Sequence, residues 1–308
     1  MRRIIKNLYF RIFIFFVLSS MLGFATKYAG EFQELVVGGR ICGMGGTGIA
    51  QGVEPASIIL NPANAISLNR SLHLMHSENF SGIVKNEFGG FVGIKDDVAY
   101  GVEAQMVSVD GIKLTTLPDT NKQPGDDNRP FPYDTVSTRD VIFYLNAAKR
   151  KSILNFGLNL KFYYRDLAVM SGFGGGVDVG MKLNLKNLNL GIGVRDFVLA
   201  PIFWESKTKE FISPKISTGI APYFPLIMLN SVVIFELDII KDLSLNNFSL
   251  NSGLEFAYKD KLFFRAGRNE NRYTAGAGIK YRKLIFDYGL ITHPDLGISN
   301  KFSAGIEF

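Results

Sequence analysis

The chain has 308 residues, of which 47% are apolar, and it carries a formal net charge of +6. Residues 1–25 hold four of the basic residues and no acidic one, so the remainder holds 30 basic and 28 acidic residues. This balance excludes the concentrated basic surface of a nucleic-acid-binding protein. The single cysteine, Cys42, cannot form an internal disulfide and lies too far from the N-terminal apolar run for lipoprotein acylation.

Residues 1–25 have the pattern of a secretory signal peptide. Four basic residues precede the apolar run "IFIFFVLSSMLGF", and small residues stand at Gly23 and Ala25. The apolar run is short for an uncleaved membrane anchor, which needs about 20 apolar residues. We therefore predict export, with cleavage after Ala25.

The stretch "GMGGTG", from Gly43 to Gly48, matches the G-x-G-x-x-G dinucleotide fingerprint. That fingerprint requires a preceding buried strand, a following helix and an acidic residue about 20 positions later. Residues 55–77 contain no Asp or Glu, and prolines interrupt the segment after the glycines. The glycines are therefore better explained by close backbone packing or positive-φ turns than by a nucleotide.

From residue 71 onward, apolar and polar residues alternate with a period of two, which predicts β-strands with one apolar face. In "SILNFGLNLKFYYRD", for example, Leu154, Phe156 and Leu158 share one face, while Asn155 and Asn159 share the other. About 14 such segments occur, and most have the ~10 residues that a tilted strand needs to cross a bilayer. They are 71–80, 84–94, 97–109, 137–150, 152–165, 171–184, 187–197, 211–221, 226–240, 246–258, 260–269, 271–281, 283–292 and 296–308.

Long and short connections alternate along the chain. Every second connection is short, whereas the two longest, around residues 110–136 and 195–211, both belong to the other set. In an up-and-down barrel this places the long loops on one rim, as in bacterial outer-membrane barrels with short periplasmic turns. A soluble β-protein could also alternate, but the export signal, the strand lengths and the terminal Phe308 favour a transmembrane antiparallel β-barrel in an outer membrane.

Several segments resemble the PorV/PorQ family of outer-membrane proteins, which is related to FadL-type barrels. The family's opening pattern is matched by Gly38-Gly39-Arg40, Gly43-Met44-Gly45-Gly46, Glu54-Pro55-Ala56-Ser57 and Asn61-Pro62-Ala63. The strands "GLNLKF" and "KFSAGIEF" also have the family's character, although they are less specific.

The resemblance implies an N-terminal plug over residues 26–70 inside a barrel formed by residues 71–308. Its glycines would allow close packing against the wall, Pro62 would fix a turn, and Asn61 would satisfy nearby backbone groups. Phe308 matches the C-terminal aromatic residue that such barrels present to the assembly machinery. The plug residues singled out in this way are Gly43, Gly45, Gly46, Gly48, Asn61, Pro62 and Ala63.

No catalytic or metal-binding pattern is present in the sequence. His73 and His76 would point to opposite faces of a strand, and the acidic residues of 110–134 lack the spacing of a calcium loop. We therefore expect neither an enzyme nor a cofactor. Charged residues that would face the lumen, such as Lys161, Arg165 and Glu255, predict a polar interior.

Two functions follow as expectations. The resemblance implies a type IX secretion component that meets secretion subunits or cargo at its outer loops, with Phe131, Tyr133 and Trp204 as candidate contacts. The alternative is a FadL-like channel for hydrophobic small molecules, which needs an apolar pocket below the outer loops. A purely structural barrel in contact only with lipid is a third possibility.

Overall fold

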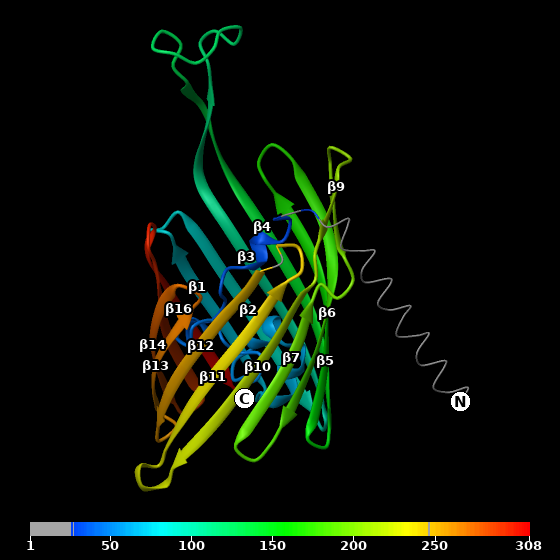
Figure 1. Ribbon diagram of the computed structural model, residues 1–308, viewed down its shortest axis with the longest axis vertical. Helices are drawn as coiled ribbons and strands as arrows, with labels where there is room; N and C mark the ends of the chain where they lie inside the picture. The colour runs from blue at the N-terminus through cyan, green and yellow to red at the C-terminus, as the bar shows by residue number, and fades with distance from the viewer. Residues whose placement is uncertain (1–25, 27, 246) are drawn as a thin grey trace, which may run out of the picture.

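The computed structural model describes residue 26, residues 28–245 and residues 247–308. The predicted signal peptide over residues 1–25 lies outside the described residues. Within them, nearly all the regular structure belongs to one antiparallel sheet that closes on itself (Figure 1).

Fourteen strands form the closed wall, which confirms the predicted all-β antiparallel barrel. Each strand pairs with its neighbours along the chain, β7 pairs with β10 across an intervening hairpin, and β1 pairs with β16 to close the sheet. The wall consists of β1 (Ser71–Asn79), β2 (Val84–Lys95), β3 (Val98–Thr116), β4 (Phe131–Lys151), β5 (Leu154–Asp166), β6 (Ser171–Asn184), β7 (Leu188–Arg195), β10 (Lys215–Leu226), β11 (Ser231–Asp242), β12 (Asn247–Tyr258), β13 (Leu262–Asn269), β14 (Arg272–Tyr281), β15 (Leu284–His293) and β16 (Gly297–Glu307).

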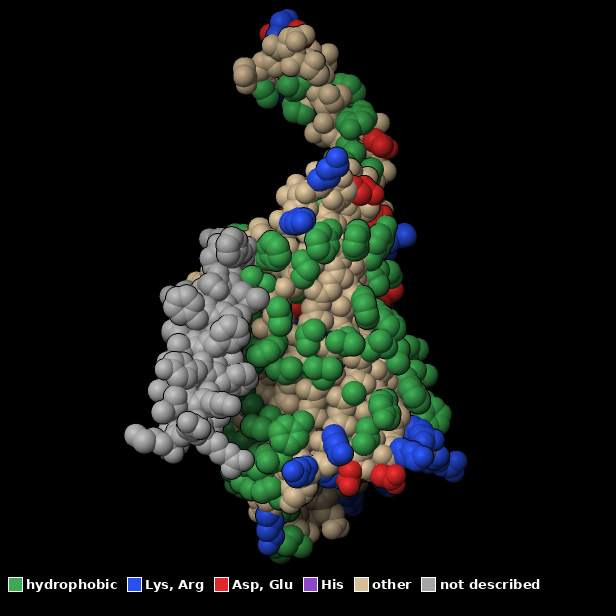
Figure 2. Space-filling view, turned by 90° about the vertical axis from the view of Figure 1, so that its right-hand side faces the viewer, with side chains coloured by type: hydrophobic (Ala, Val, Ile, Leu, Met, Phe, Trp, Pro, Cys, Tyr) green, Lys and Arg blue, Asp and Glu red, His purple; other side chains and the backbone are tan. Residues whose placement is uncertain are grey.

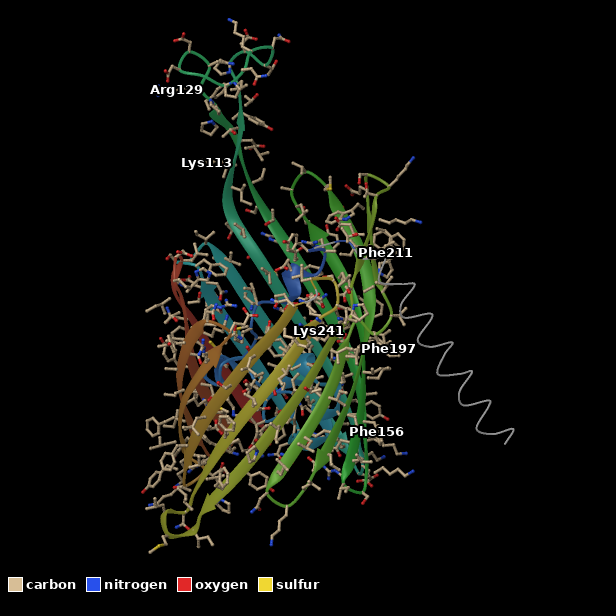
Figure 3. All side chains as sticks on the ribbon, viewed as in Figure 1. Lys113, Arg129, Phe156, Phe197, Phe211 and Lys241 are labelled. Carbon is tan, nitrogen blue, oxygen red and sulfur yellow. The ribbon has the colours of Figure 1, made fainter. Side chains whose placement is uncertain are left out.

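The two faces of the wall differ in polarity because side chains alternate along each strand. On β1, Ser71 and His73 are buried inside the barrel, whereas Leu72 and Leu74 are exposed on the outside. Apolar side chains cover the middle of the outer wall, and Lys and Arg gather at the end opposite the long hairpin (Figure 2). Phe156, one of the outer residues, points away from the barrel (Figure 3). This is the arrangement of a wall that faces lipid.

The two rims of the barrel carry different connections. At the rim where Ser71 begins the first strand, which we call the turn rim, connections are short, such as residues 96–97 and 282–283. The opposite rim, which we call the loop rim, carries the long hairpin between β3 and β4. The alternation of connection lengths in the sequence is therefore present in the structure.

The segment predicted as an irregular loop over 110–136 is largely a β-ribbon. The ladder between β3 and β4 continues past the rim from Ile112 opposite Val136 to Thr116 opposite Phe131, after an irregularity at Gly111. Gly111 adopts a φ of 73°, which a glycine tolerates without strain. The hairpin therefore projects far beyond the barrel, with Lys113 and Arg129 on it (Figure 3).

The other predicted long loop also contains strands. Residues after β7 form the hairpin of β8 (Ala200–Trp204) and β9 (Lys209–Ile212), and β8 adds to the upper part of β6 through Gly172, Phe173 and Gly174. The strand predicted over 211–221 lies slightly later in the chain, as β10, which begins at Lys215 and ends at Leu226. A 3-10 turn, η4 (Ile227–Leu229), then leads into β11.

Residues 28–68, which we call the N-terminal segment, lie within the barrel (Figure 1). They form η2 (Glu31–Gln33), α2 (Gly39–Gly43), α3 (Ser57–Leu60) and η3 (Pro62–Ser67). α2 packs on β13 to β16, whereas η3 packs on β3 to β6, so the segment spans the lumen between opposite walls. Within the described chain, no helix combines the length and apolar character needed to cross a membrane.

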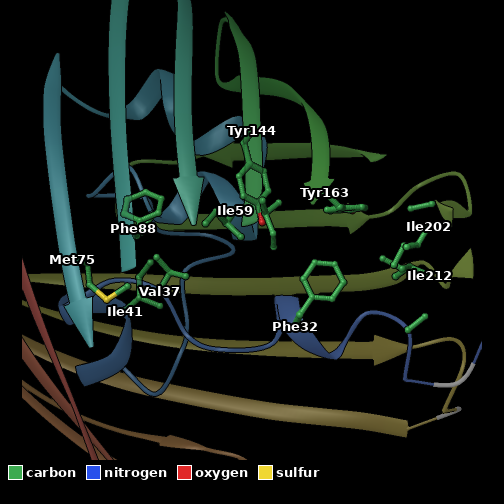
Figure 4. Close-up of a cluster of buried hydrophobic side chains, with 14 of the residues drawn as sticks. Phe32, Val37, Ile41, Ile59, Met75, Phe88, Tyr144, Tyr163, Ile202 and Ile212 are labelled. Atoms are coloured by element: carbon green, nitrogen blue, oxygen red, sulfur yellow. The ribbon is translucent and has the colours of Figure 1, made fainter. Parts of the chain in front are cut away.

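A hydrophobic cluster joins the N-terminal segment to the wall (Figure 4). Phe32, Ile41 and Ile59 of the segment pack with Phe88 and Tyr144 of the strands, and all five are buried. Burying such side chains supplies roughly 1.5–3 kcal/mol each. The segment is therefore an integral part of the folded barrel.

Candidate functional site

A cavity of about 350 Å³ lies between the N-terminal segment and strands β11 to β14, on the side of the loop rim. We call it the outer cavity. Its apolar part comes from Val36, Ile41, Ile59 and Leu60 of the segment and from Ile240 of β11. The rest of the lining is polar or charged and includes Asn247, Ser249, Asn251, Asn269, Glu270 and Arg272. A cavity of this size that combines apolar contacts with polar groups can hold a small organic molecule.

Charged residues at the outer cavity are paired with one another. Lys215 Nζ lies 3.0 Å from Glu34 Oε1 and 2.7 Å from Asp242 Oδ2, and Arg195 Nη2 lies 3.2 Å from Glu34 Oε1. Burial alone would raise the pKa of Glu34, but the charges of Arg195 and Lys215 hold that pKa below its usual value. Glu270 and Arg272 line the same cavity outside these pairs, so a ligand would meet polar groups as well as the apolar wall.

A second cavity, of about 310 Å³, lies on the side of the turn rim. We call it the inner cavity. Its lining is strongly charged and includes Arg40, Glu54, His73, Glu255 and Arg265. A hollow of about 580 Å³ at the turn rim shares part of this lining, so the inner cavity continues toward the rim.

The partition between the two cavities is thin. Ile41 and Ala56 line the outer cavity, while Arg40 and Glu54 line the inner one. The backbone N–H of Ile41 donates to Glu54 Oε1 at 3.1 Å, which ties the two chain stretches of the partition together. We therefore take the outer cavity and this partition as the candidate functional site.

Ion pairs fix the partition to the barrel wall. Arg40 donates to both oxygens of Glu255, at 2.9 and 3.0 Å, and Arg265 bridges Glu255 to Asp287. Two-point pairing of an arginine with a carboxylate restricts orientation as well as distance. The Oε2 atom of Glu54 lies 3.8 Å from Nδ1 of His73.

Two carboxylates of β11 hold the backbone that follows the glycine run. Asp238 Oδ2 accepts the N–H groups of Gly48 and Ile49 at 2.8 and 3.1 Å. Glu236 Oε1 accepts those of Ala50 and Gln51 at 3.1 and 3.0 Å. This role could not be predicted from the sequence, because no local pattern links an acidic residue in a strand to a distant backbone segment.

The glycines singled out from the sequence lie where the segment meets β11 to β14. A Cβ atom on Gly43 would lie 2.9 Å from the Cα of Gly276, which is closer than real side chains allow. Gly45 and Gly46 have φ values of 74° and 77°, in the left-handed region that favours glycine. The N–H of Gly48 binds Asp238, as described above.

The second part of the motif lies against the opposite wall. Asn61 Oδ1 accepts the N–H of Ala63 at 3.1 Å and so caps η3, in which Pro62 is the first residue. Asn61 Nδ2 also donates to the carbonyls of Ile49 and Met181, at 2.7 and 3.2 Å. The motif therefore contacts two walls of the barrel and does not form one compact site.

The remaining candidate residues are separate from this region. Phe308 is exposed at the turn rim, and its N–H donates to the carbonyl of Arg70. Phe131 and Tyr133 are exposed on the projecting hairpin. Trp204 instead lies on β8 with only 8% of its surface exposed, its ring near the guanidinium of Arg165, so it offers little surface to a partner.

No group of three or more His, Cys, Asp or Glu side chains suited to holding a metal ion occurs among the described residues. The site offers apolar contacts, hydrogen bonds and ion pairs. It consists of the outer cavity and the partition that separates this cavity from the inner one.

The fold and the site together define a 14-stranded barrel of the transmembrane type with an occupied lumen. Solved structures of similar fold include the P. putida toluene transporter TodX, with a TM-score of 0.58 and 12% sequence identity over 88% of this chain and 98% of that chain. The monoaromatic hydrocarbon channel CymD has a TM-score of 0.57 and 13% identity, over 88% of this chain and 97% of its own. No protein-family model matches the chain, and no curated protein sequence matches it either.

At these identities the likeness concerns the fold alone. The more specific resemblance to PorV/PorQ, drawn from the N-terminal motif, remains a prediction.

Proposed function

We propose that this chain is an outer-membrane channel for small apolar molecules. The observation that carries the proposal is the outer cavity, which has one apolar wall and lies inside a barrel whose outer wall suits lipid. The likeness in fold to a toluene transporter and a monoaromatic hydrocarbon channel supports it. The signal-peptide pattern supports export, and the loop rim would then face the outside of the cell.

We further propose that residues 26–70 act as the plug of this channel. The segment spans the lumen, and its partition of Arg40, Ile41, Glu54 and Ala56 separates the outer cavity from the inner one. A molecule in the outer cavity would have to displace this partition to reach the inner cavity. The inner cavity combines charged side chains with apolar ones such as Val232, Ile234 and Phe263, so it could take up a small molecule that has passed the partition.

The volume of the outer cavity favours a ligand of about one ring. It lies at the lower end of the range for small-molecule sites, which is roughly 300–1,000 Å³. The basic groups Arg195 and Lys215 already face carboxylates, so a neutral ligand fits this site better than a carboxylate. We therefore choose toluene as the probe.

The test is toluene uptake into vesicles that contain the full-length protein. Ile240→Trp would fill the outer cavity, whereas Ile239→Trp, one residue along the same strand, would place the ring on the exposed outer face. We expect uptake to fall about tenfold or more with Ile240→Trp, because a loss of ~1.4 kcal/mol of binding is a factor of ten. Ile239→Trp should transport like the wild type. Equal uptake by both variants would reject the outer cavity as the binding compartment.

A second candidate function rests on the projecting hairpin. Its exposed Phe131 and Tyr133 stand beyond the rim, where they would be accessible to a partner protein. This is the surface that a role in protein export or surface attachment would use. The outer cavity has no part in such a role, and the channel is therefore the function that we favour.

A further inference from the structure

Three neighbouring side chains on the inner face of the wall carry buried oxygens that lack a hydrogen-bond partner among the described residues. They are both carboxylate oxygens of Glu103, Oε1 of Gln105 and Oδ1 of Asn146. Glu103 and Gln105 are each 1% exposed, and Asn146 is 5% exposed. Leaving a buried polar group unpaired is destabilising, and more so for a charged one. Such groups therefore require an explanation.

The three residues adjoin one another in the sheet. Glu103 and Gln105 are two apart on β3 and so share the inner face, and Tyr144 of β4 is directly opposite Glu103. Asn146 is two residues further along β4, on the same face and diagonal to Glu103. Diagonal neighbours lie roughly 7–8 Å apart, within reach of long side chains. We call Glu103, Gln105 and Asn146 the acceptor cluster.

The amide nitrogens of this cluster are already in use. Gln105 Nε2 donates to Asn86 Oδ1 at 3.1 Å. Asn146 Nδ2 donates to Asn159 Oδ1 at 2.7 Å and to the carbonyl of Pro62 at 3.2 Å. A protonated Glu103 carboxyl would supply one O–H, which can pair with one of the amide oxygens. The other oxygens still need an O–H or N–H donor from outside the protein.

The surroundings of the cluster suit an aromatic or aliphatic group. The register places Phe88 opposite Gln105 and Tyr144 opposite Glu103, and both belong to the hydrophobic cluster of Figure 4. An apolar site with a few convergent polar groups is the usual form of a small-molecule site.

The acceptor cluster is also linked to the outer cavity. Ile59 lines that cavity and belongs to the same hydrophobic cluster as Phe88 and Tyr144. Val36, another lining residue, accepts a hydrogen bond from Asn86 through its carbonyl at 3.3 Å, and Asn86 in turn accepts from Gln105. The three residues of the cluster do not line the outer cavity itself, so a molecule there would reach them only if the segment moved at Ile59.

We propose that the acceptor cluster recognises apolar molecules that carry one hydroxyl or amino group, such as phenols, with Glu103 accepting the hydrogen bond. The proposal rests on the proposed channel function, because the ligand arrives through the outer cavity. It narrows the substrate class from hydrocarbons in general to those with a hydrogen-bond donor.

The test compares 4-methylphenol with toluene, which share a ring and a methyl group, for binding to the full-length protein in detergent. We expect the wild type to bind 4-methylphenol at least tenfold more tightly than toluene. Glu103→Leu should abolish this preference while leaving toluene affinity within about twofold. Glu103→Gln should retain part of the preference, because its amide oxygen still accepts a hydrogen bond. Glu87→Leu, a partly exposed glutamate on β2, should change neither affinity.

The thermal stability of the same variants provides a second readout. Removing an unpaired buried carboxyl should leave the melting temperature of Glu103→Leu equal to that of the wild type or higher. If Glu103→Leu melts several degrees lower and binds toluene poorly, Glu103 is a structural residue and the proposal is wrong. If Glu103→Leu does not fold, the test rests on Glu103→Gln. The proposal is rejected if Glu103→Gln melts at a lower temperature than the wild type and yet prefers 4-methylphenol as strongly as the wild type does.

The other outcomes separate this proposal from the proposed function. Equal affinity of the wild type for both molecules would reject the acceptor cluster as a recognition site and leave the channel standing. Absence of binding for either molecule would reject both. Loss of the preference in Glu103→Leu with toluene binding intact would support both.

Discussion

Glu54 is the residue on which the partition between the two cavities depends. Its Oε1 atom holds the N–H of Ile41, and its Oε2 atom faces His73. Burial, with the nearby carboxylate of Asp287 adding to it, raises the pKa of Glu54 to about 7, although Arg40 acts in the opposite direction. The usual value is 4.5, so this carboxyl releases its proton later in the folded protein than in the unfolded chain.

The pH dependence of stability should therefore carry a contribution from Glu54. In the unfolded chain the group ionises near pH 4.5, and in the folded protein near pH 7, so stability falls as the pH rises between these values. The difference corresponds to about 3 kcal/mol. We expect the wild type to lose more stability than Glu54→Gln when thermal unfolding in detergent is compared at pH 4.5 and pH 7.5.

The control is Glu78→Gln, which changes an exposed carboxylate on β1. It should follow the wild type at both pH values. Parallel curves for the wild type and Glu54→Gln would show that this carboxyl is not the titrating group.

The direction of a strand side chain and the start of a helix could be predicted from the sequence, because both depend on residues that are close together in the chain. Alternation placed His73 and His76 on opposite faces, and in the structure His73 lies inside and His76 outside. The Asn61-Pro62 pair has the chemistry of a helix start. The partners of Glu54, Glu236 and Asp238 could not be predicted in this way. Their roles depend on backbone or side chains brought together across the lumen, and sequence spacing contains no record of that proximity.

The β3–β4 hairpin is the largest element outside the barrel wall. Its tip is organised by Asn128, whose Nδ2 atom donates to the carbonyls of Asp119, Lys122 and Gln123. None of these contacts reaches the barrel, so the tip is structurally separate from the outer cavity.

Shortening this hairpin should distinguish its role from that of the cavity. We expect that replacing residues 117–130 with a two-residue turn leaves the melting temperature and toluene uptake unchanged, because no cavity residue is removed. Mass spectrometry of the protein purified gently from its own membrane checks the second function. Two results together would support the export role over the channel. A partner protein would co-purify in equimolar amount with the wild type but not with the shortened form, and Ile240→Trp would take up toluene as the wild type does.

Strand prediction succeeded where alternation was regular and failed where pairing extends beyond the rim. Ile112 and Leu114 alternate with polar residues, but turn-forming residues downstream made the whole stretch look like a loop. The β8–β9 hairpin was missed for a related reason. Its strands are short, and β8 is stabilised by pairing with β6, which is some 30 residues earlier in the chain.

For the whole molecule, the principal question is whether the N-terminal segment closes the barrel. The inner face of the wall is polar, with Lys161, Glu255 and Arg265 buried against the segment or one another. Without the segment, such a lumen would fill with water, as in barrels that form aqueous channels.

We therefore expect deletion of residues 29–68 to create an ion-conducting pore. The measurement is conductance in planar lipid bilayers, with the wild type and the variant shortened at 117–130 as closed references. Circular dichroism would first establish that the deleted form retains its β-structure. A folded deletion variant that conducts no better than the wild type would contradict the plug.

The class of fold could be inferred from the sequence because barrel closure needs only enough alternating strands of sufficient length. The contents of the lumen could not. The two cavities and the partition arise from contacts between the N-terminal segment and strands far along the chain. The acceptor cluster arises from the register of β3 with β4, which the sequence pattern does not specify.

The closure of the barrel also has a consequence for its biogenesis. The N-terminal segment leads directly into β1, whose ladder with β16 is the seam of the barrel. Yet its anchors include Ser303, which accepts from the N–H of Gly39 across 264 positions, and Glu255, which binds Arg40. The contacts of α2 can therefore form only after β12 and β16 have been synthesised, whereas those of η3 need only the earlier strands β3 to β6. Once β1 has paired with β16, a folded segment could enter only through a rim. We therefore expect the segment to dock in stages while the sheet is still open.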